Sequence, residues 1–342
     1  MSVKEGAPTF GLWYDFRQKL PFAQAYGDFY AECLEEVEEG ESLDFSHVWL
    51  SEHHFVDDGY LSTPLVMAAA IAARTETMRI GTNVLLLPMH HPLRVAEDAA
   101  VVDLISGSRF TLGVGLGYVL HEFETLGFDR KNRPSLLEEG VEVIRRAWTE
   151  GKVGYKGRRW RFDDLPFEPR PGRSVPIFFG GYTEPALDRA ARMADGFLAS
   201  STRVDIGETY TMLHERLAAH GRDDEDFPFV ASTTVYVHES SDRAWEIASP
   251  GIAYQASRYG EWGAAGPKPE RVRPEDLDRE RYHVGAPNYV AERLIQLHER
   301  SPYDHLCFWG RLPGVSHEQA LASMQLFASE VAPRVQEAVM TA

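Results

Sequence analysis

The sequence predicts a (β/α)8 barrel with insertions, organised as a single domain over residues 1–342. Eight short apolar runs alternate along the chain with segments whose apolar residues recur at helical spacing, which is the pattern of repeated strand–helix units. Several runs are apolar almost throughout, as expected of parallel strands covered on both faces. A chain of 342 residues with 44% hydrophobic content is sufficient for one barrel of this class.

The first half of the chain contains four predicted strand–helix units. The third strand stops at Pro88, because proline cannot donate to a strand ladder. The helix before the fourth strand ends near Gly107, a residue type common at helix C-termini. The predicted strands are 9–14, 47–50, 79–87 and 110–117, and the predicted helices are 29–39, 65–74, 93–105 and 136–148.

The second half contains four more units. None of the eight units forms part of a short internal repeat, which favours a barrel. The predicted strands are 175–179, 196–199, 229–237 and 305–309, and the predicted helices are 184–193, 210–219, 243–248, 289–300 and 317–331.

Three excursions interrupt this alternation, at about 118–135, 151–172 and 250–287. The second is basic, aromatic and rich in turn residues, and it resembles a surface hairpin. The third crowds glycine and proline together with many charges. It either closes over the barrel mouth or forms a mobile surface loop with no role.

Charge and cysteine content exclude several classes of protein. The chain has 35 Lys and Arg against 52 Asp and Glu, and its net charge of −17 repels phosphate backbones and anionic membranes. Cys33 and Cys307 form neither a disulfide framework nor a metal-spaced pair. The chain shows no apolar signal segment and no run approaching ~18 apolar residues. We therefore expect a cytoplasmic protein with no nucleic-acid or membrane partner.

A carboxylate and two imidazoles, Glu52-His53-His54, stand directly after the second strand. The carboxyl ends of parallel strands open into a shared crevice where barrel enzymes do their chemistry. Imidazole titrates near neutrality and a neighbouring carboxylate can fix its tautomer, so the three form a candidate acid–base set, with a structural role as the alternative. His90 and His91 follow the third strand, which raises a metal site of the barrel-hydrolase type. Adjacent residues of an extended chain point to opposite faces, so at most one histidine of each pair would reach a common ion.

The turn Gly180-Gly181-Tyr182-Thr183 lies between a predicted strand and a predicted helix. Exposed amides and the helix dipole at such a turn favour a phosphate, although a plain tight turn is the alternative. Arg133, just ahead of another helix, would add a cation. The glycine-rich run 113–117 lacks the spacing of a dinucleotide fingerprint.

A set of short motifs follows in order along the chain. They are Glu52-His53-His54-Phe55, Gly81-Thr82-Asn83-Val84, Leu87-Pro88 with His91-Pro92, Ala96-Glu97-Asp98, Ser108-Arg109-Phe110, Gly113 to Tyr118 with Glu122-Phe123, and Gly180-Gly181 with Ala190-Ala191 and Asp195-Gly196-Phe197. Taken together, these motifs occur in the order found in the bacterial luciferase-like flavin monooxygenases, and the chain resembles that family over roughly residues 8–200. The resemblance implies a (β/α)8 barrel of luciferase-like type, usually dimeric, which binds reduced flavin at the carboxyl ends of its strands.

The resemblance also implies roles for single residues. His53 matches the family's active-site histidine, and Asn83 and Val84 fall where members often have a cis peptide behind the flavin ring. Gly115 stands where luciferase itself has a cysteine, which argues against light emission, and Glu122 matches an acidic residue below the same strand. The remaining implied cofactor contacts are Gly180, Gly181 and Thr183 as the phosphate seat, with Arg133 one position from the family's phosphate-contacting arginine and Pro134 in that arginine's place.

These observations predict a monooxygenase that uses reduced FMN and O2, through a flavin peroxide, to oxidise a small organic substrate. His53 would act as the acid–base group, with Glu52 orienting it. A separate reductase would supply the reduced FMN. Strand-end aromatic residues would line the substrate pocket, with core packing as the alternative for each: Trp13, Tyr14, Phe55, Tyr118 and Trp309.

Three other functions remain open. The first is a deazaflavin-dependent oxidoreductase that transfers hydride, the second is a metal-dependent barrel hydrolase, and the third is a non-catalytic, flavin-storing partner subunit.

Overall fold

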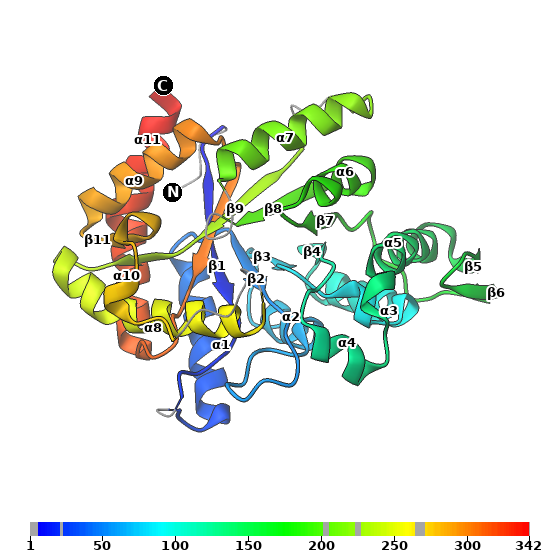
Figure 1. Ribbon diagram of the computed structural model, residues 1–342. Helices are drawn as coiled ribbons and strands as arrows, with labels where there is room; N and C mark the ends of the chain where they lie inside the picture. Colours follow the sequence, from blue (N-terminus) through cyan, green and yellow to red (C-terminus); the bar gives the residue numbers. More distant parts are fainter. Residues whose placement is uncertain (1–5, 21–22, 201–204, 223–226, 264–270, 342) are drawn as a thin grey trace.

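The computed structural model is a closed barrel of eight parallel strands with helices around it (Figure 1). It describes residues 6–20, 23–200, 205–222, 227–263 and 271–341. Each barrel strand pairs with the next barrel strand along the chain, and the last pairs with the first, which confirms the predicted fold class. The barrel strands are β1 (Thr9–Tyr14), β2 (His47–Leu50), β3 (Arg79–Thr82), β4 (Phe110–Val114), β7 (Ile177–Gly180), β8 (Gly196–Ser200), β9 (Phe229–Thr233) and β12 (His305–Trp309).

Helices follow the barrel strands and cover their outer faces. Strands such as β4, β9 and β12 are buried at every position because side chains fill the barrel on one face and helices cover the other. The α-helices are α1 (Tyr26–Ser42), α2 (Pro64–Ala72), α3 (Pro92–Ile105), α4 (Leu120–Leu126), α5 (Arg133–Glu150), α6 (Glu184–Met193), α7 (Ile206–Ala219), α8 (Ser241–Glu261), α9 (Pro287–Arg300), α10 (His317–Leu326) and α11 (Ala332–Thr341).

The remaining elements lie outside the barrel sheet. Two pairs of short strands and several single helical turns make up this set. They are β5 (Lys152–Lys156) paired with β6 (Arg161–Pro166), β10 (Val235–Val237) paired with β11 (His283–Gly285), the 3-10 turns η1 (Leu87–Met89), η2 (Arg130–Asn132), η3 (Pro274–Asp276) and η4 (Arg279–Arg281), and the π-helical turn η5 (Phe327–Val331).

The third and fourth strands end earlier than predicted. The third was expected over 79–87 but β3 ends at Thr82, after which the chain has a cis peptide bond between Asn83 and Val84 and only one bridge, from Leu85 to Val114. The fourth was expected over 110–117, yet β4 ends at Val114. Apolar composition continues past the end of β3 because the residues that follow are buried without being in a strand: Leu86 packs with Met89 and Phe123, and Leu87 packs against α5.

The seventh predicted strand, 229–237, is two strands. Residues 229–233 form β9 in the barrel, whereas β10 pairs in parallel with β11 outside it. The predicted run is apolar throughout because β9 and β10 are both fully buried, although in different sheets.

The excursion predicted at 250–287 begins as a helix. α8 continues through Pro250 to Glu261, so the interruption expected at the proline is wrong. A proline inside a helix costs about 3 kcal/mol, and buried apolar residues on both sides, including Trp245 and Ile252, offset that cost. Residues 264–270 of this excursion lie outside the described residues, and 271–287 contain η3, η4 and β11.

The other two excursions and the last helix can also be compared with their predictions. The hairpin predicted at 151–172 is confirmed as the antiparallel pair of β5 and β6. The stretch 118–135 contains α4 and η2, and the last helix, predicted to end at 331, continues through η5 into α11. Among the described residues, no helix is both long and apolar enough to span a membrane.

Candidate active site

His53 forms a buried pair with a carboxylate from another strand–helix unit. It lies just after β2, and its Nδ1 is 2.9 Å from Oε1 of Glu122 in α4. The same oxygen accepts the backbone N–H of His54 at 2.8 Å. Glu122 is fully buried and His53 is 6% exposed. Because the carboxylate accepts from Nδ1–H, Nε2 of the neutral ring is the atom left to accept a proton, and it lies 3.4 Å from the hydroxyl of Tyr118.

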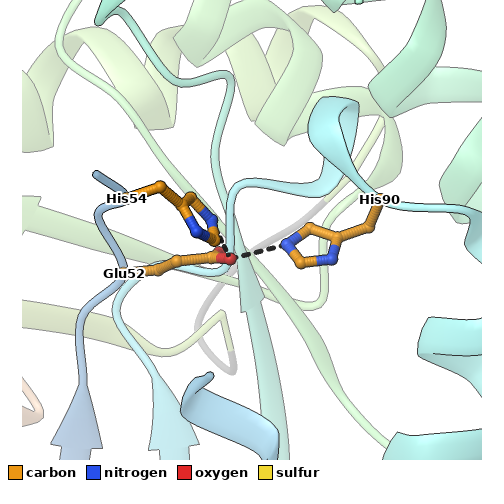
Figure 2. Close-up of side chains that lie close together, drawn as sticks. All are labelled: Glu52, His54 and His90. Carbon is orange, nitrogen blue, oxygen red and sulfur yellow. Dashed lines mark hydrogen bonds and ion pairs between the residues drawn. The ribbon is translucent and has the colours of Figure 1, made fainter. Parts of the chain in front are cut away.

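The expectation that Glu52 orients His53 is therefore wrong. Glu52 points the other way, where its Oε1 is 2.9 Å from Nε2 of His54 and 2.6 Å from Nε2 of His90 (Figure 2). Its second oxygen accepts the backbone N–H of Leu86. Burial by itself would raise the pKa of the Glu52 carboxyl, but the two histidines outweigh burial and lower the pKa to about 2. Burial acts to lower the pKa of His90, but Glu52 outweighs it and the pKa is raised.

One histidine of each sequence pair thus converges on Glu52, as a shared metal ion would require. The distances fit hydrogen bonds better, because ligands of a tetrahedral zinc at 2.0–2.1 Å would stand about 3.3 Å apart. We therefore interpret Glu52, His54 and His90 as a hydrogen-bonded cluster that ties the end of β2 to the segment after β3.

The end of the barrel carries a layer of aromatic and small polar groups. The rings of Trp13 and Trp309 stack with centroids 4.0 Å apart and planes 10° apart. The indole of Trp13 donates to the hydroxyl of Ser51 at 2.5 Å, and that hydroxyl donates to the carbonyl of Asn83 at 3.0 Å. The amide of Asn83 lies 3.9 Å from the sulfur of Cys307. Side chains from four barrel strands or their ends therefore meet here.

Gly115 and Gly180 make room for the side chain of Val84. A Cβ on Gly115 would stand 2.4 Å from Cγ2 of Val84, and a Cβ on Gly180 would stand 2.7 Å from its Cγ1. Neither distance is compatible with a real side chain, so both positions require glycine while valine occupies this place. The cis peptide that the family resemblance implied between Asn83 and Val84 is confirmed.

The predicted phosphate seat lies between β7 and α6. Gly181 packs closely on α6, since a Cβ there would stand 2.6 Å from Cβ of Ala186. Thr183 is the N-cap of α6, but its side chain makes no capping hydrogen bond. Arg133, the first residue of α5, interacts electrostatically with Tyr182 of this turn. Burial and neighbouring arginines lower its pKa, and no carboxylate pairs with it in the part of the chain that the structure describes.

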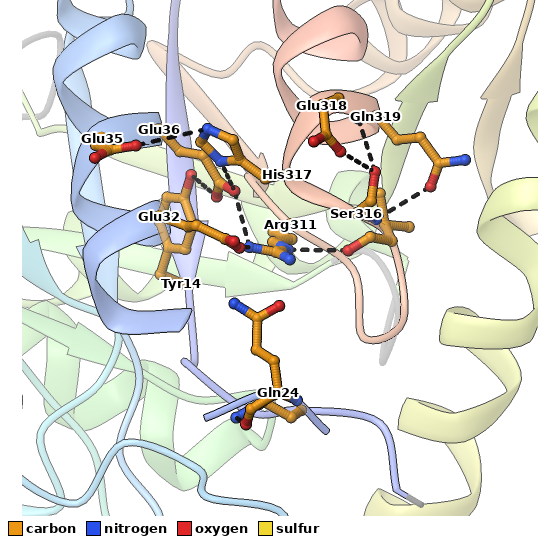
Figure 3. A network of polar contacts seen from close by, with 12 residues as sticks. Tyr14, Gln24, Glu32, Glu35, Glu36, Arg311, Ser316, His317, Glu318 and Gln319 are labelled. Atoms are coloured by element: carbon orange, nitrogen blue, oxygen red, sulfur yellow. Dashed lines mark hydrogen bonds and ion pairs between the residues drawn. The ribbon is translucent and has the colours of Figure 1, made fainter. Parts of the chain in front are cut away.

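Two residues predicted to line the substrate pocket do not face the mouth. Tyr14 is buried between the barrel and α1, where its hydroxyl donates to Oε2 of Glu36 (Figure 3). Neighbouring residues of a strand point to opposite faces, so Trp13 and Tyr14 cannot both turn inward. Phe55 is 58% exposed and lies at the surface.

Several residues that surround His53 in the structure were not predicted from the sequence as site residues. The ring of Trp262 has its centroid 4.7 Å from that of His53, and Tyr60 and Tyr259 follow at 4.9 and 6.3 Å. Tyr259 and Trp262 belong to the 250–287 excursion, for which closure over the mouth was one of two alternatives, and that alternative is the single feature that could have pointed to them. Arg17, described below, had no such feature.

Comparison with known proteins gives consistent matches. A family model described as luciferase-like monooxygenase matches residues 10–303. The 4-hydroxyprotoasukamycin monooxygenase of Streptomyces nodosus subsp. asukaensis is 27% identical over 319 residues, or 88% of this chain and 85% of that protein. An F420-dependent glucose-6-phosphate dehydrogenase of Microbacterium testaceum (strain StLB037) is 31% identical over 218 residues, or 60% of this chain and 64% of that protein. The structure of monooxygenase RslO1 from Streptomyces bottropensis matches with a TM-score of 0.83 and 25% identity, covering 95% of this chain and 99% of that one.

Proposed function

Because the chain belongs to the luciferase-like monooxygenase family, we propose that it is a flavin-dependent monooxygenase that oxidises a small organic substrate with reduced FMN and O2. The family includes flavin-dependent and F420-dependent members, and membership supports an oxidoreductase. The observation that carries the proposal is the buried His53–Glu122 pair at the carboxyl ends of the barrel strands, where barrel enzymes carry out their chemistry.

The residues present fit a flavin. Arg133, with no carboxylate partner among the described residues, lies by the turn of Gly181 and Thr183, and the first amides of α6 lack intrahelical partners. These groups would hold the phosphate. Val84, the stacked Trp13 and the layer beneath them would support the ring. When bound, reduced flavin supplies the electrons that activate O2.

The chain's own residues would position a proton and exclude water. Glu122 holds His53 in the tautomer whose Nε2 can take up a proton, and it stabilises the ring when that proton is bound. Tyr118 faces the same Nε2 and can pass a proton to it or receive one. The aromatic rings around His53 keep bulk water from the reacting atoms.

The reduced FMN is proposed to come from a separate reductase. The glycine-rich run after β4 has no dinucleotide spacing, and the next helix, α4, begins only at Leu120. We therefore infer that no nicotinamide binds at this strand end and that electrons arrive on the flavin itself.

The second candidate is a deazaflavin-dependent oxidoreductase that transfers hydride. It is favoured by the 31% identity to the F420-dependent enzyme. Both candidates use the same barrel mouth, and they differ in whether O2 takes part.

Anaerobic titration separates the two. We expect reduced FMN to bind with micromolar or tighter affinity and reduced F420 to bind at least tenfold more weakly, followed by tryptophan fluorescence. Tighter binding of reduced F420 would support the second candidate. Binding of neither compound would remove both.

A further inference from the structure

Arg17 is a buried cation whose two terminal nitrogens have no hydrogen-bond partner in the part of the chain that the structure describes. It follows β1, and its side chain has no exposed surface. Nε is 2.7 Å from Oδ2 of Asp15, and the backbone N–H of Arg17 donates to the other carboxylate oxygen. Nη1 and Nη2 donate no hydrogen bond to any of the described residues. Unpaired buried donors are costly, and the large majority of buried polar groups in folded proteins have a hydrogen-bond partner in the protein or in ordered water, so these two nitrogens need an explanation.

The same aromatic rings contact Arg17 and His53. The guanidinium carbon of Arg17 lies 4.4 Å from the ring centroid of Tyr60, 4.6 Å from that of Tyr259 and 5.6 Å from that of Trp262. Tyr60 meets His53 edge to face, with planes 85° apart. Arg17 and His53, the candidate acid–base group, therefore contact the same three aromatic rings.

Side chains, and not sheet backbone, cover Arg17 on this side. Tyr259 belongs to the last turn of α8 and Trp262 is its C-cap. A displacement of these two rings would expose Nη1 and Nη2 without breaking any pairing of the barrel.

The charges around Arg17 determine whether Nη1 and Nη2 can bind a charged or a neutral ligand oxygen. Asp15 already pairs with it, and the buried Asp58 is close enough to raise its pKa as well. Asp58 also pairs with Arg258, whose other partners are Asp57 and Glu261, so acids outnumber the two arginines here. Burial acts to lower the pKa of Arg17, but these acids outweigh burial, so the group stays charged. Glu122, which pairs with His53, adds a third buried carboxylate. A carboxylate ligand would therefore meet repulsion, whereas a neutral acceptor oxygen would not.

We propose that Arg17 recognises the organic substrate, by donating from Nη1 and Nη2 to a neutral carbonyl oxygen of a compound whose ring lies against Tyr60 and Trp262. The inference rests on the proposed function, because it takes the space beside His53 as the substrate site. It names the substrate class as ring compounds that carry a ketone or a similar uncharged carbonyl.

Binding measured without turnover tests this. The probes are acetophenone, ethylbenzene and benzoate, which share a ring and differ in the oxygen that they offer. We titrate each into the full chain without flavin and again with reduced FMN under anaerobic conditions, and follow tryptophan fluorescence. We expect acetophenone to bind at least tenfold more tightly than ethylbenzene and benzoate.

Substitution assigns the preference to Arg17. In Arg17→Met the ratio of the ethylbenzene dissociation constant to the acetophenone dissociation constant should fall to about one. If Arg17→Met folds poorly, Arg17→Lys takes its place and should keep part of the preference for acetophenone. Arg311→Met is the matched control, because Arg311 also lies over an aromatic ring, that of Phe29 at 4.8 Å, but already pairs with Glu32 and Glu36 in a different network. That variant should keep the ratio.

Equal binding of all three probes by the unchanged protein, tightest binding of benzoate, or an unchanged ratio in a folded Arg17→Met would each overturn the inference. A carbonyl preference that depends on Arg17 in a protein that binds no reduced flavin would uphold it and remove the proposed function instead.

Discussion

At the scale of single residues, the site depends on which carboxylate meets which imidazole. Glu122 pairs with His53, while Glu52 pairs with His54 and His90. The first pair faces the aromatic rings near the mouth, and the second ties two strand ends together. One carboxylate therefore serves the proposed chemistry and the other serves stability.

Removal of the imidazole tests the first pair. We expect His53→Ala to fold but to lose about 10²- to 10⁴-fold in turnover, the usual contribution of a positioned acid–base group. O2 consumption with reduced FMN and the first substrate identified measures the loss. His317→Ala is the matched control, because His317 also contacts a buried carboxylate, Glu36, in a different network. Normal O2 consumption by His53→Ala would remove His53 from the mechanism.

The second pair predicts a dependence of stability on pH. The pKa of Glu52 falls from 4.5 to about 2 in the folded protein, so its ionised form stabilises the fold by about 3 kcal/mol above pH 4.5. That stabilisation is lost as the pH falls towards 2. Glu52→Gln should unfold at lower urea concentration at pH 7, and the difference from the unchanged protein should shrink from pH 4.5 to 3. A constant difference over this range would contradict the assignment.

At the scale of elements, the ends of β3, β4 and β7 are shaped around one side chain. Val84 follows β3 and fits between Gly115 after β4 and Gly180 at the end of β7. Gly115 and Gly180, which the family resemblance placed at the cofactor site, are therefore explained first by the close approach of Val84. The proposed flavin would then rest on Val84 and not on the glycines.

A paired substitution tests this packing. Gly115→Ala should lower the free energy of unfolding by about 1–3 kcal/mol through overpacking, and Val84→Ala in the same chain should restore most of it. Thermal unfolding of the two single variants and the double variant gives the coupling. Gly172→Ala, where a new Cβ meets no atom within 4 Å, should leave stability unchanged. Additive effects at 84 and 115 would show that the two side chains do not compete for space.

At the scale of the whole molecule, neighbouring helices α2 and α3 expose apolar side chains. Val66 on α2 is 70% exposed, and Val101, Leu104 and Ile105 share a face of α3 at 41–49%. Apolar surface of this kind often marks an interface. We therefore propose that the expected homodimer forms through these two helices, with the same patch on both copies.

Light scattering after size exclusion tests the assembly. We expect a dimer for the unchanged chain and a monomer for Leu104→Glu, because a buried unpaired charge would oppose association. Leu165→Glu, at an equally exposed leucine of β6, should remain dimeric. A monomeric unchanged protein, or a dimeric Leu104→Glu, would rule out this interface.

Most of the fold was predictable because the signals were local. Apolar runs such as 305–309 and helical spacing such as 184–193 are properties of a few consecutive residues, and both appear in the structure with those bounds. Errors occurred where an apolar run did not mean one strand, as at 79–87 and 229–237. Amino-acid composition indicates which residues are buried, and a buried strand does not differ in composition from a buried segment that follows a strand.

The sequence by itself determined the barrel, and it placed His53 at the end of a buried strand. Only the tertiary structure decided the partners of that histidine. Glu52 is adjacent in sequence, but adjacent residues of an extended chain point to opposite sides, so it could not be the partner. Closure of the barrel instead brings Glu122 from the fourth unit, and the end of α8 brings Trp262. Contacts between units depend on where the closed sheet puts their ends, and no short stretch of sequence contains that information.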